Sequence, residues 1–130
     1  MLKNLILHEE LIENLEPLSN FSSNTLEECC GLVLKYLSTG QFLSQRSLEK
    51  ASLKLDLGPD SLDACLKALA ELFLQTIKQI KTMQKCQLAY EHFGIPQAEL
   101  LAKFCFEQLA PIISMIRFLY PFKISIFLEK

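Results

Sequence analysis

The stretch at residues 55–78, LDLGPDSLDACLKALAELFLQTIK, decides the fold of this 130-residue chain. It contains Gly58-Pro59-Asp60, which combines a break, a proline suited to the first helical position and an acid for the first turn. Apolar residues then recur every three or four positions as far as Ile80. This spacing is typical of one face of an α-helix, so the sequence predicts a long amphipathic helix that starts at Pro59.

The two faces of this predicted helix differ in polarity, as a partly exposed helix requires. Leu72 and Leu74 broaden the apolar sector, so we expect the helix to lie centrally, with neighbours on more than one side. We expect Leu62, Leu66, Leu69 and Phe73 at the centre of the core. The full apolar face adds Cys65, Ile77 and Ile80, and the polar face consists of Asp63, Lys67, Glu71, Gln75, Lys78 and Lys81.

The same period predicts three helices before this one. The first has the stripe Leu5, His8, Leu11, Ile12 and Leu15, and Pro17 should end it. For the second, residues 22–24 (SSN) offer caps, the apolar face runs from residue 26 to residue 37, and a glycine at position 40 follows as a stop. The third begins near a capping serine at position 44 and runs to about residue 55.

Two more helices are expected after it. A short one covers residues 84–92 and ends at Gly94. Ile95-Pro96 then opens a long helix that reaches Ile112, with Pro111 inside the pattern as a kink or an end. No internal repeat and no alternating strand precedes residue 122. The predicted fold class is therefore all-α, a compact bundle of about six helices.

The last residues, 112–130, read IISMIRFLYPFKISIFLEK and are mostly apolar. A membrane span needs about twenty apolar residues with few charges, and this run holds Arg117, Pro121 and Lys123. We expect a helical domain over residues 1–117 and an irregular apolar tail, or the stub of a second domain, over residues 118–130. Association with a membrane through residues 112–130 is the alternative interpretation.

Composition narrows the class of protein. Thirteen basic against fifteen acidic residues give a net charge of −2, which disfavours a nucleic-acid partner. Five cysteines, an odd number without C-x₂-C spacing, are typical of packed free thiols rather than of a disulfide framework or a zinc site. The first residues lack the pattern of a secretory or transit peptide. We expect a cytoplasmic protein.

Catalysis has few candidates in this sequence. His92 with Cys86 or Cys105 could form a thiol nucleophile and its base, but that pairing needs spatial contact and a lowered thiol pKa. Asp60 and Asp63 lie a turn apart, where capping chemistry is the ordinary interpretation. No nucleotide-binding, hydrolase or metalloprotease motif is present. We expect no enzymatic activity, no catalytic residue, no cofactor and no metal.

Charged surfaces offer weaker signals. Lys78, Lys81 and Lys85 fall on one helical side as a small basic strip. It is a solvated face, a site for an acidic partner protein or, third, a contact for a phosphate backbone. The first thirty residues hold six acids and one base, most simply a solvated helix surface. No residue can be singled out as a partner-binding contact from these patterns.

The order of these motifs resembles the N-terminal helical domain of COMM-domain-containing proteins. The stretch at residues 55–78 is similar to the family's central helix, and LHEELIENLEPLSNFSSNTLEECCGLVLKYL at residues 7–37 looks like its first two helices. FGIPQAELLAKFCFEQLAPII at residues 93–113 resembles the turn into its last helix. The similarity covers residues 5–115. The family's COMM domain typically opens with a Trp-Arg or Trp-Lys strand, so in this Trp-free chain we expect that domain to be missing or truncated.

The resemblance implies a non-enzymatic protein-interaction and adaptor function. Family members belong to an assembly that supports endosomal recycling of membrane proteins, and they are linked to cullin ubiquitin ligases and to restraint of NF-κB signalling. The implied partners are other COMM-domain proteins and endosomal recycling subunits, with cullin ligases as a further class. The implied location is cytoplasmic, with nuclear or endosome-associated pools.

Overall fold

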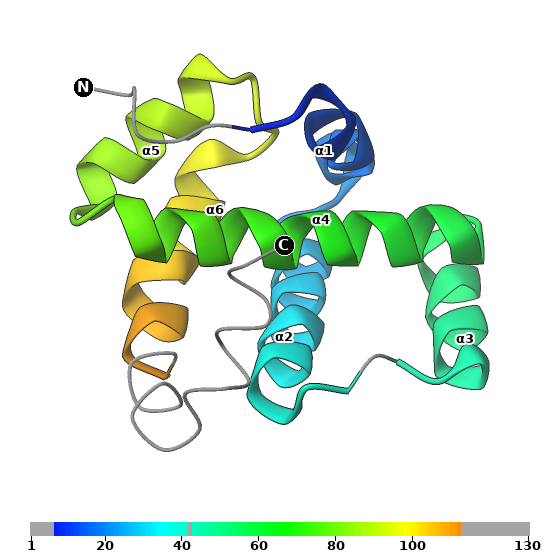
Figure 1. Cartoon of the computed structure of the whole chain (residues 1–130). Helices are drawn as coiled ribbons and strands as arrows, with labels where there is room; N and C mark the ends of the chain where they lie inside the picture. Colours follow the sequence, from blue (N-terminus) through cyan, green and yellow to red (C-terminus); the bar gives the residue numbers. More distant parts are fainter. Residues whose placement is uncertain (1–6, 42, 113–130) are drawn as a thin grey trace.

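The computed structural model describes residues 7–41 and 43–112, and every regular element within them is helical. Figure 1 shows α4 running across the molecule, with α2 and α3 extending from one side and α1 and α5 on the other. The all-α prediction is confirmed. The elements are α1 (Glu9–Asn14), η1 (Glu16–Asn20), α2 (Ser23–Thr39), α3 (Gln45–Leu55), α4 (Pro59–Gln79), α5 (Met83–His92), α6 (Ala98–Phe104) and η2 (Cys105–Leu109).

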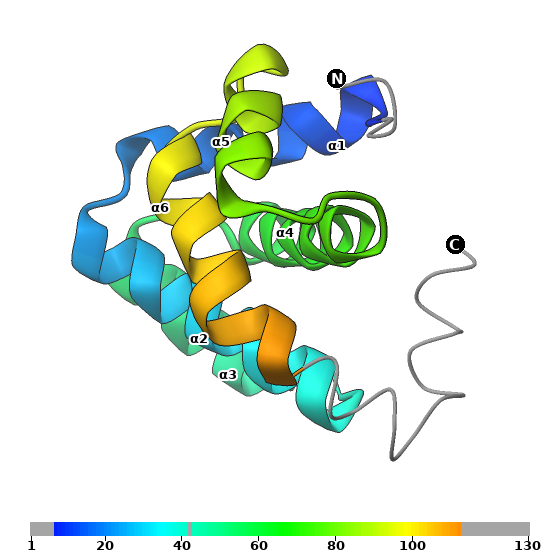
Figure 2. The same cartoon turned by 90° about the vertical axis from the view of Figure 1, so that its left-hand side faces the viewer.

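The central position of α4 is confirmed. Gly58 precedes the helix and Pro59 occupies its first turn, as the sequence predicts. Helices α1, α2 and α3 and the 3₁₀ turn η1 all pack against α4. The view along α4 in Figure 2 shows α1, α5, α6 and α2 grouped around it. The expected core residues are buried, as are the two that broaden the sector: Leu62, Leu66, Leu69, Leu72, Phe73 and Leu74.

The predicted helix ends of α2 and α3 are also confirmed. The Ser22 hydroxyl accepts a hydrogen bond from the Thr25 amide at 3.2 Å, and the Ser44 hydroxyl accepts one from the Ser47 amide at 3.1 Å. Gly40 closes α2 with φ of 74°, a left-handed conformation that favours glycine. These caps fix where the helices start and stop, and so which faces they bury.

The N-terminal segment departs from prediction in two ways. His8 was expected on the apolar stripe, yet its side chain is exposed, because α1 begins only at Glu9 and His8 is its extended cap. Leu11 and Leu15 of that stripe are buried as predicted. Beyond α1, Pro17 lies within the 3₁₀ turn η1, which buries Leu18 against the core.

The start of α6 also differs from prediction. The helix begins at Ala98 rather than at Ile95-Pro96, after Gln97 with φ of 56°. The Gln97 amide nitrogen donates hydrogen bonds to the carbonyls of Leu18 at 2.7 Å and Phe21 at 2.8 Å. These two bonds hold the residue in a left-handed conformation that non-glycine residues rarely adopt.

Pro111 changes the helix without ending it. Residues 105–109 (η2) form a wider turn, in which the Ala110 amide donates to the Cys105 carbonyl five residues earlier. The chain is helical again from Ala110 to Ile112, the last of the described residues. In a regular α-helix a proline ring clashes with the carbonyl four residues before it, so a wider turn before Pro111 relieves a clash that a regular helix would have.

The predicted tail at residues 118–130 and the boundary at residue 117 lie outside the described residues. Among residues 7–41 and 43–112, no helix is both long and apolar enough to cross a membrane.

Candidate docking groove

The structure separates the histidine and the thiols of the catalytic hypothesis. His92 is exposed at the end of α5, where its ring lies against Phe93. Cys86 and Cys105 are fully buried and contact each other. The hydrogen bond that the Cys105 thiol donates to Cys86, together with burial, holds its pKa well above the ordinary range. A thiol in this state is a packed group rather than a nucleophile beside a base.

The remaining cysteines, Cys29, Cys30 and Cys65, are buried free thiols as well. Burial, reinforced by the nearby carboxylate of Glu28, raises the pKa of Cys29 to about 11. Burial raises the pKa of Cys30 and of Cys65 to about 12, with smaller effects from neighbouring thiols. The prediction of packed free thiols is confirmed for all five cysteines.

The two aspartates at the start of α4 do not act together. Asp60 is exposed, whereas the Asp63 carboxylate lies 2.9 Å from the ammonium group of Lys67 one turn later. In the part of the chain that the structure describes, no group of three or more His, Cys, Asp or Glu residues could hold a metal ion.

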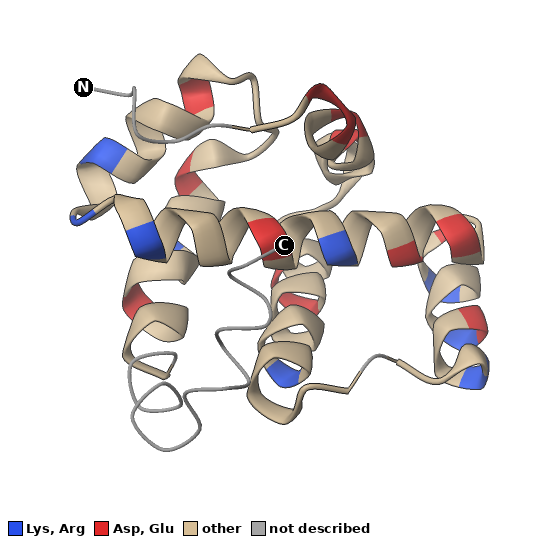
Figure 3. Ribbon diagram, viewed as in Figure 1, with Lys and Arg blue, Asp and Glu red and all other residues tan. Residues whose placement is uncertain are grey.

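The three lysines of the predicted basic strip lie on different elements of the structure. Lys78 lies at the end of α4, Lys81 in the connection and Lys85 on α5, because the helix breaks between Gln79 and Met83. The prediction that these lysines share one helical side is therefore wrong. All three are exposed, and Figure 3 shows basic positions around this corner of the molecule.

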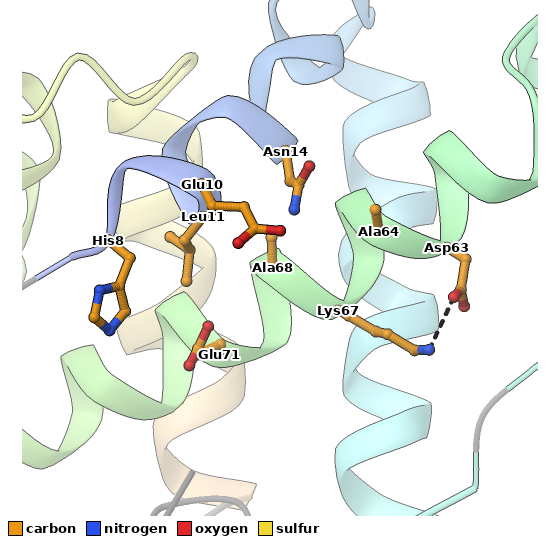
Figure 4. A pocket seen from close by; sticks show the side chains of 9 residues that line it. All are labelled: His8, Glu10, Leu11, Asn14, Asp63, Ala64, Lys67, Ala68 and Glu71. Atoms are coloured by element: carbon orange, nitrogen blue, oxygen red, sulfur yellow. Dashed lines mark ion pairs between the residues drawn. The ribbon is translucent and has the colours of Figure 1, made fainter.

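A groove lies between α1 and α4. It has a volume of about 410 Å³, and Figure 4 shows its lining side chains. Three of them, Leu11, Ala64 and Ala68, supply aliphatic surface. Ala64 and Ala68 are one turn apart on α4, and their small side chains leave the space between the helices open. The polar lining consists of His8, Glu10, Asn14, Asp63, Lys67 and Glu71.

The charges of this α1–α4 groove are mostly negative. Three carboxylates face one ammonium group, so the lining carries a net charge of about −2 with His8 neutral. Asp63 is occupied by its ion pair with Lys67. Glu10 and Glu71 have no ion-pair partner among the described residues. In Figure 4 the Glu10 side chain extends from α1 over the Ala68 position of α4.

A second groove lies between α2 and α6 and has a volume of about 310 Å³. Leu26, Cys30, Leu100 and Phe104 form its apolar part, and Leu100 is 37% exposed. Its charged lining residues are of both signs, Glu27, Lys103 and Glu107. With two acids and one base, its lining carries less net negative charge than the α1–α4 groove, which has three acids and one base.

Sequence reasoning did not locate the α1–α4 groove. The acids near the N-terminus and the polar face of α4 are each typical of a solvated helix surface. Their charged side chains are exposed or half-buried in the structure. The available signal was Ala64 and Ala68, two small residues one turn apart beside Asp63, Lys67 and Glu71. That signal becomes a groove only when α1 is placed across α4.

Comparison with known families identifies the helical domain that contains this groove. The family model of the COMMD2-7/10 HN domain matches residues 6–105, which include all of α1 to α6. The chain belongs to the COMM-domain-containing (COMMD) protein family. The predicted resemblance is confirmed, and the COMMD HN domain is in general a non-catalytic interaction domain. No curated protein and no solved structure matches the chain significantly.

All residues that line the α1–α4 groove lie inside the matched HN region. The groove is therefore formed by the HN domain itself, between its first helix and its central helix. COMMD proteins interact in general with other proteins of their family. A groove in such an interaction domain is a candidate docking site.

Proposed function

We propose that this COMMD chain is a non-enzymatic adaptor whose HN domain binds other proteins. The match to the HN domain over residues 6–105 is the observation that carries the proposal. The partners are other COMM-domain proteins and subunits of the assembly that supports endosomal recycling of membrane proteins. These partner classes follow from the family resemblance.

Two features of the structure support an interaction function over a catalytic one. The α1–α4 groove is open, 410 Å³ in volume, and lined by charged and aliphatic side chains without a nucleophile among them. Burial raises the pKa of Cys29 and Cys30, whereas the hydrogen bond with Cys105 lowers the pKa of Cys86, but the Cys86 side chain is fully buried. An open groove of this kind suits binding, whereas thiol catalysis needs a thiol that is accessible to the substrate.

The finer functional assignments rest on the same resemblance. We assign to this chain a part in endosomal recycling, with regulation of cullin ubiquitin ligases and of NF-κB signalling as further functions of the family. The corresponding location is cytoplasmic, with nuclear and endosome-associated pools. The net charge of −2 gives no reason to include nucleic acid among the partners.

The proposed organisation has a helical domain at residues 1–117 and an apolar tail at residues 118–130. The described part of the domain ends at Ile112 on the last helix. In this arrangement the HN domain supplies the binding surfaces. Membrane contact, where it occurs, is assigned to the tail alone.

Proximity labelling tests this function. The chain is fused to a promiscuous biotin ligase and expressed in cells, with the free ligase as control. The expected biotinylated set is enriched in COMM-domain proteins and endosomal recycling subunits. A set without either class, from a fusion that is folded and expressed, would refute the proposed function. Enrichment of cullin subunits would extend it to ubiquitin ligases.

A further inference from the structure

We propose that the α1–α4 groove binds a lysine- or arginine-bearing segment of a partner protein. The aliphatic stem of the cationic residue packs on Leu11, Ala64 and Ala68, and its charged head lies between Glu10 and Glu71. This inference deepens the adaptor function proposed above and rests on it for the identity of the partner class. Its physical basis is the groove itself.

The aliphatic part of the groove determines the shape of the ligand. Leu11 and Ala68 are buried with 4% and 6% exposure, so the base of the groove already belongs to the core. Alanine side chains one turn apart on α4 allow another side chain to lie close to the helix. Lysine and arginine have unbranched stems that cover apolar surface while their heads stay at the polar edge.

The carboxylates determine the charge of the ligand. Glu10 comes from α1 and Glu71 from α4, so both helices contribute an acid without an ion-pair partner in the described structure. Asp63 already pairs with Lys67 at 2.9 Å, which leaves the surplus negative charge on the other two. A cation between carboxylates of two helices gains charge-assisted hydrogen bonds, and an arginine can use two of its donors at once.

The volume of the groove favours a segment of chain over a small cation. At about 410 Å³ it lies within the range of roughly 300–1,000 Å³ that drug-sized ligands occupy. His8 and Asn14 add polar groups at the α1 side, where backbone amides and carbonyls of an extended segment can form hydrogen bonds. A basic peptide satisfies the aliphatic surface, the carboxylates and these polar groups together.

The test is an NMR titration of the isotope-labelled full chain with the peptide acetyl-Arg-Ala-Arg-Ala-Arg-amide. Its neutral counterpart carries citrulline in place of each arginine and has nearly the same shape. We expect amide shift changes at residues 8–14 and 63–71 with the arginine peptide and none with the citrulline peptide. Shifts spread over all exposed acids, or equal shifts with both peptides, would overturn the proposal.

Variants separate the groove from general charge. Glu10→Gln with Glu71→Gln should weaken peptide binding about tenfold, the loss expected for two partly exposed ion pairs. Ala64→Leu keeps every charge but fills the groove, and should weaken binding at least as much. The matched control is Glu13→Gln with Glu16→Gln, which removes the same charge from exposed positions outside the groove. Equal weakening by the control would contradict a specific site.

Two further measurements decide the source of the cation and the link to function. Spermine is titrated in the same way, and binding as tight as that of the peptide would show a polyamine site instead of a peptide site. The proximity-labelling experiment is repeated with Glu10→Gln and Glu71→Gln. If the native chain labels COMM-domain proteins and the variant labels them equally, the groove proposal fails while the adaptor function stands. If the native chain labels none, the adaptor function fails, and the titration still decides whether the groove binds basic peptides.

Discussion

The hydroxyl of Tyr90 on α5 lies 2.8 Å from the hydroxyl of Thr76 on α4, and both side chains are fully buried. The Thr76 hydroxyl also donates to the Leu72 carbonyl at 2.7 Å. Because a hydroxyl has only one hydrogen, Tyr90 must be the donor to Thr76. Burial, with the nearby thiols of Cys105 and Cys86, raises the pKa of Tyr90 well above its ordinary value and keeps this donor protonated.

This geometry predicts an asymmetry between two substitutions. Thr76→Val leaves the buried Tyr90 hydroxyl without its oxygen acceptor, with only the weaker Cys86 sulfur as a partner, and should lower the free energy of unfolding by about 1–3 kcal/mol. Tyr90→Phe leaves Thr76 still bonded to the Leu72 carbonyl and should cost only about 1 kcal/mol. Urea denaturation measures both. A larger cost for Tyr90→Phe would contradict the assignment of Tyr90 as donor.

Gln97 gives a second prediction, because its side chain connects the start of α6 to two carbonyls near the N-terminus. Gln97→Ala removes the hydrogen bonds to Leu18 and Phe21 and should cost about 2 kcal/mol. Gln97→Gly removes the same bonds but tolerates a φ of 56°, so it should be the more stable variant by about 1 kcal/mol. Thermal or urea unfolding compares the two. Equal stability would show that the left-handed backbone carries no strain.

The buried thiols predict how stability changes with pH. In the unfolded chain a cysteine loses its proton near pH 9, whereas folded Cys29 keeps it to about pH 11 and Cys65 to about pH 12. The raised folded pKa values therefore add stability below about pH 9, and this stability is lost as the pH rises toward 11–12. Cys65→Ala should make the slope of unfolding free energy against pH, between about pH 9.5 and 11, shallower by up to about 1.4 kcal/mol per pH unit.

A slope that Cys65→Ala leaves unchanged would contradict this prediction, even though the substitution lowers stability at every pH. The same burial makes the thiols unreactive in the folded chain. Iodoacetamide near neutral pH should label the five cysteines only after unfolding. Fast stoichiometric labelling of one thiol in the folded protein would instead favour the thiol-enzyme hypothesis.

Removal of the tail predicts the extent of the folded domain. A chain that ends at Arg117 should unfold cooperatively with a Tm within a few degrees of the full chain, which corresponds to about 1 kcal/mol in a domain of roughly 100 residues. The reason is that the apolar stripes up to Pro111 can close on one another, whereas the apolar residues of 118–130 follow no helical face. Differential scanning calorimetry measures the shift. Loss of folding would make the tail an integral part of the core.

Local signals made the fold predictable from the sequence. Gly58 and Pro59 mark the start of α4, and Ser22, Ser44 and Gly40 mark other helix ends, each through hydrogen bonds or dihedral angles set within a few residues. The start of α6 could not be predicted in this way. It depends on carbonyls 76 and 79 residues away in the chain, which become acceptors for Gln97 only after folding.

The candidate site depends on tertiary structure in the same manner. Nothing in the sequence near Ala64 and Ala68 shows that Leu11 of α1 lies beside them in the folded chain. Nor does the sequence show that Glu10 and Glu71 line the same groove. His8 shows the reverse error, since helical periodicity put it on the buried stripe before the true start of α1 was known. Sequence spacing predicts which face of one helix is buried, but not how two helices leave space between them.

Affinity purification of the tagged full chain, followed by mass spectrometry, tests most directly that this COMMD protein acts by binding its own family. We predict co-purification of COMM-domain proteins and endosomal recycling subunits above the level of a tag-only control. Phe73→Ala, which removes a fully buried ring at the centre of α4 at a cost of about 3–5 kcal/mol, should abolish that co-purification. Recovery of the native chain without any COMM-domain protein would contradict the proposed function.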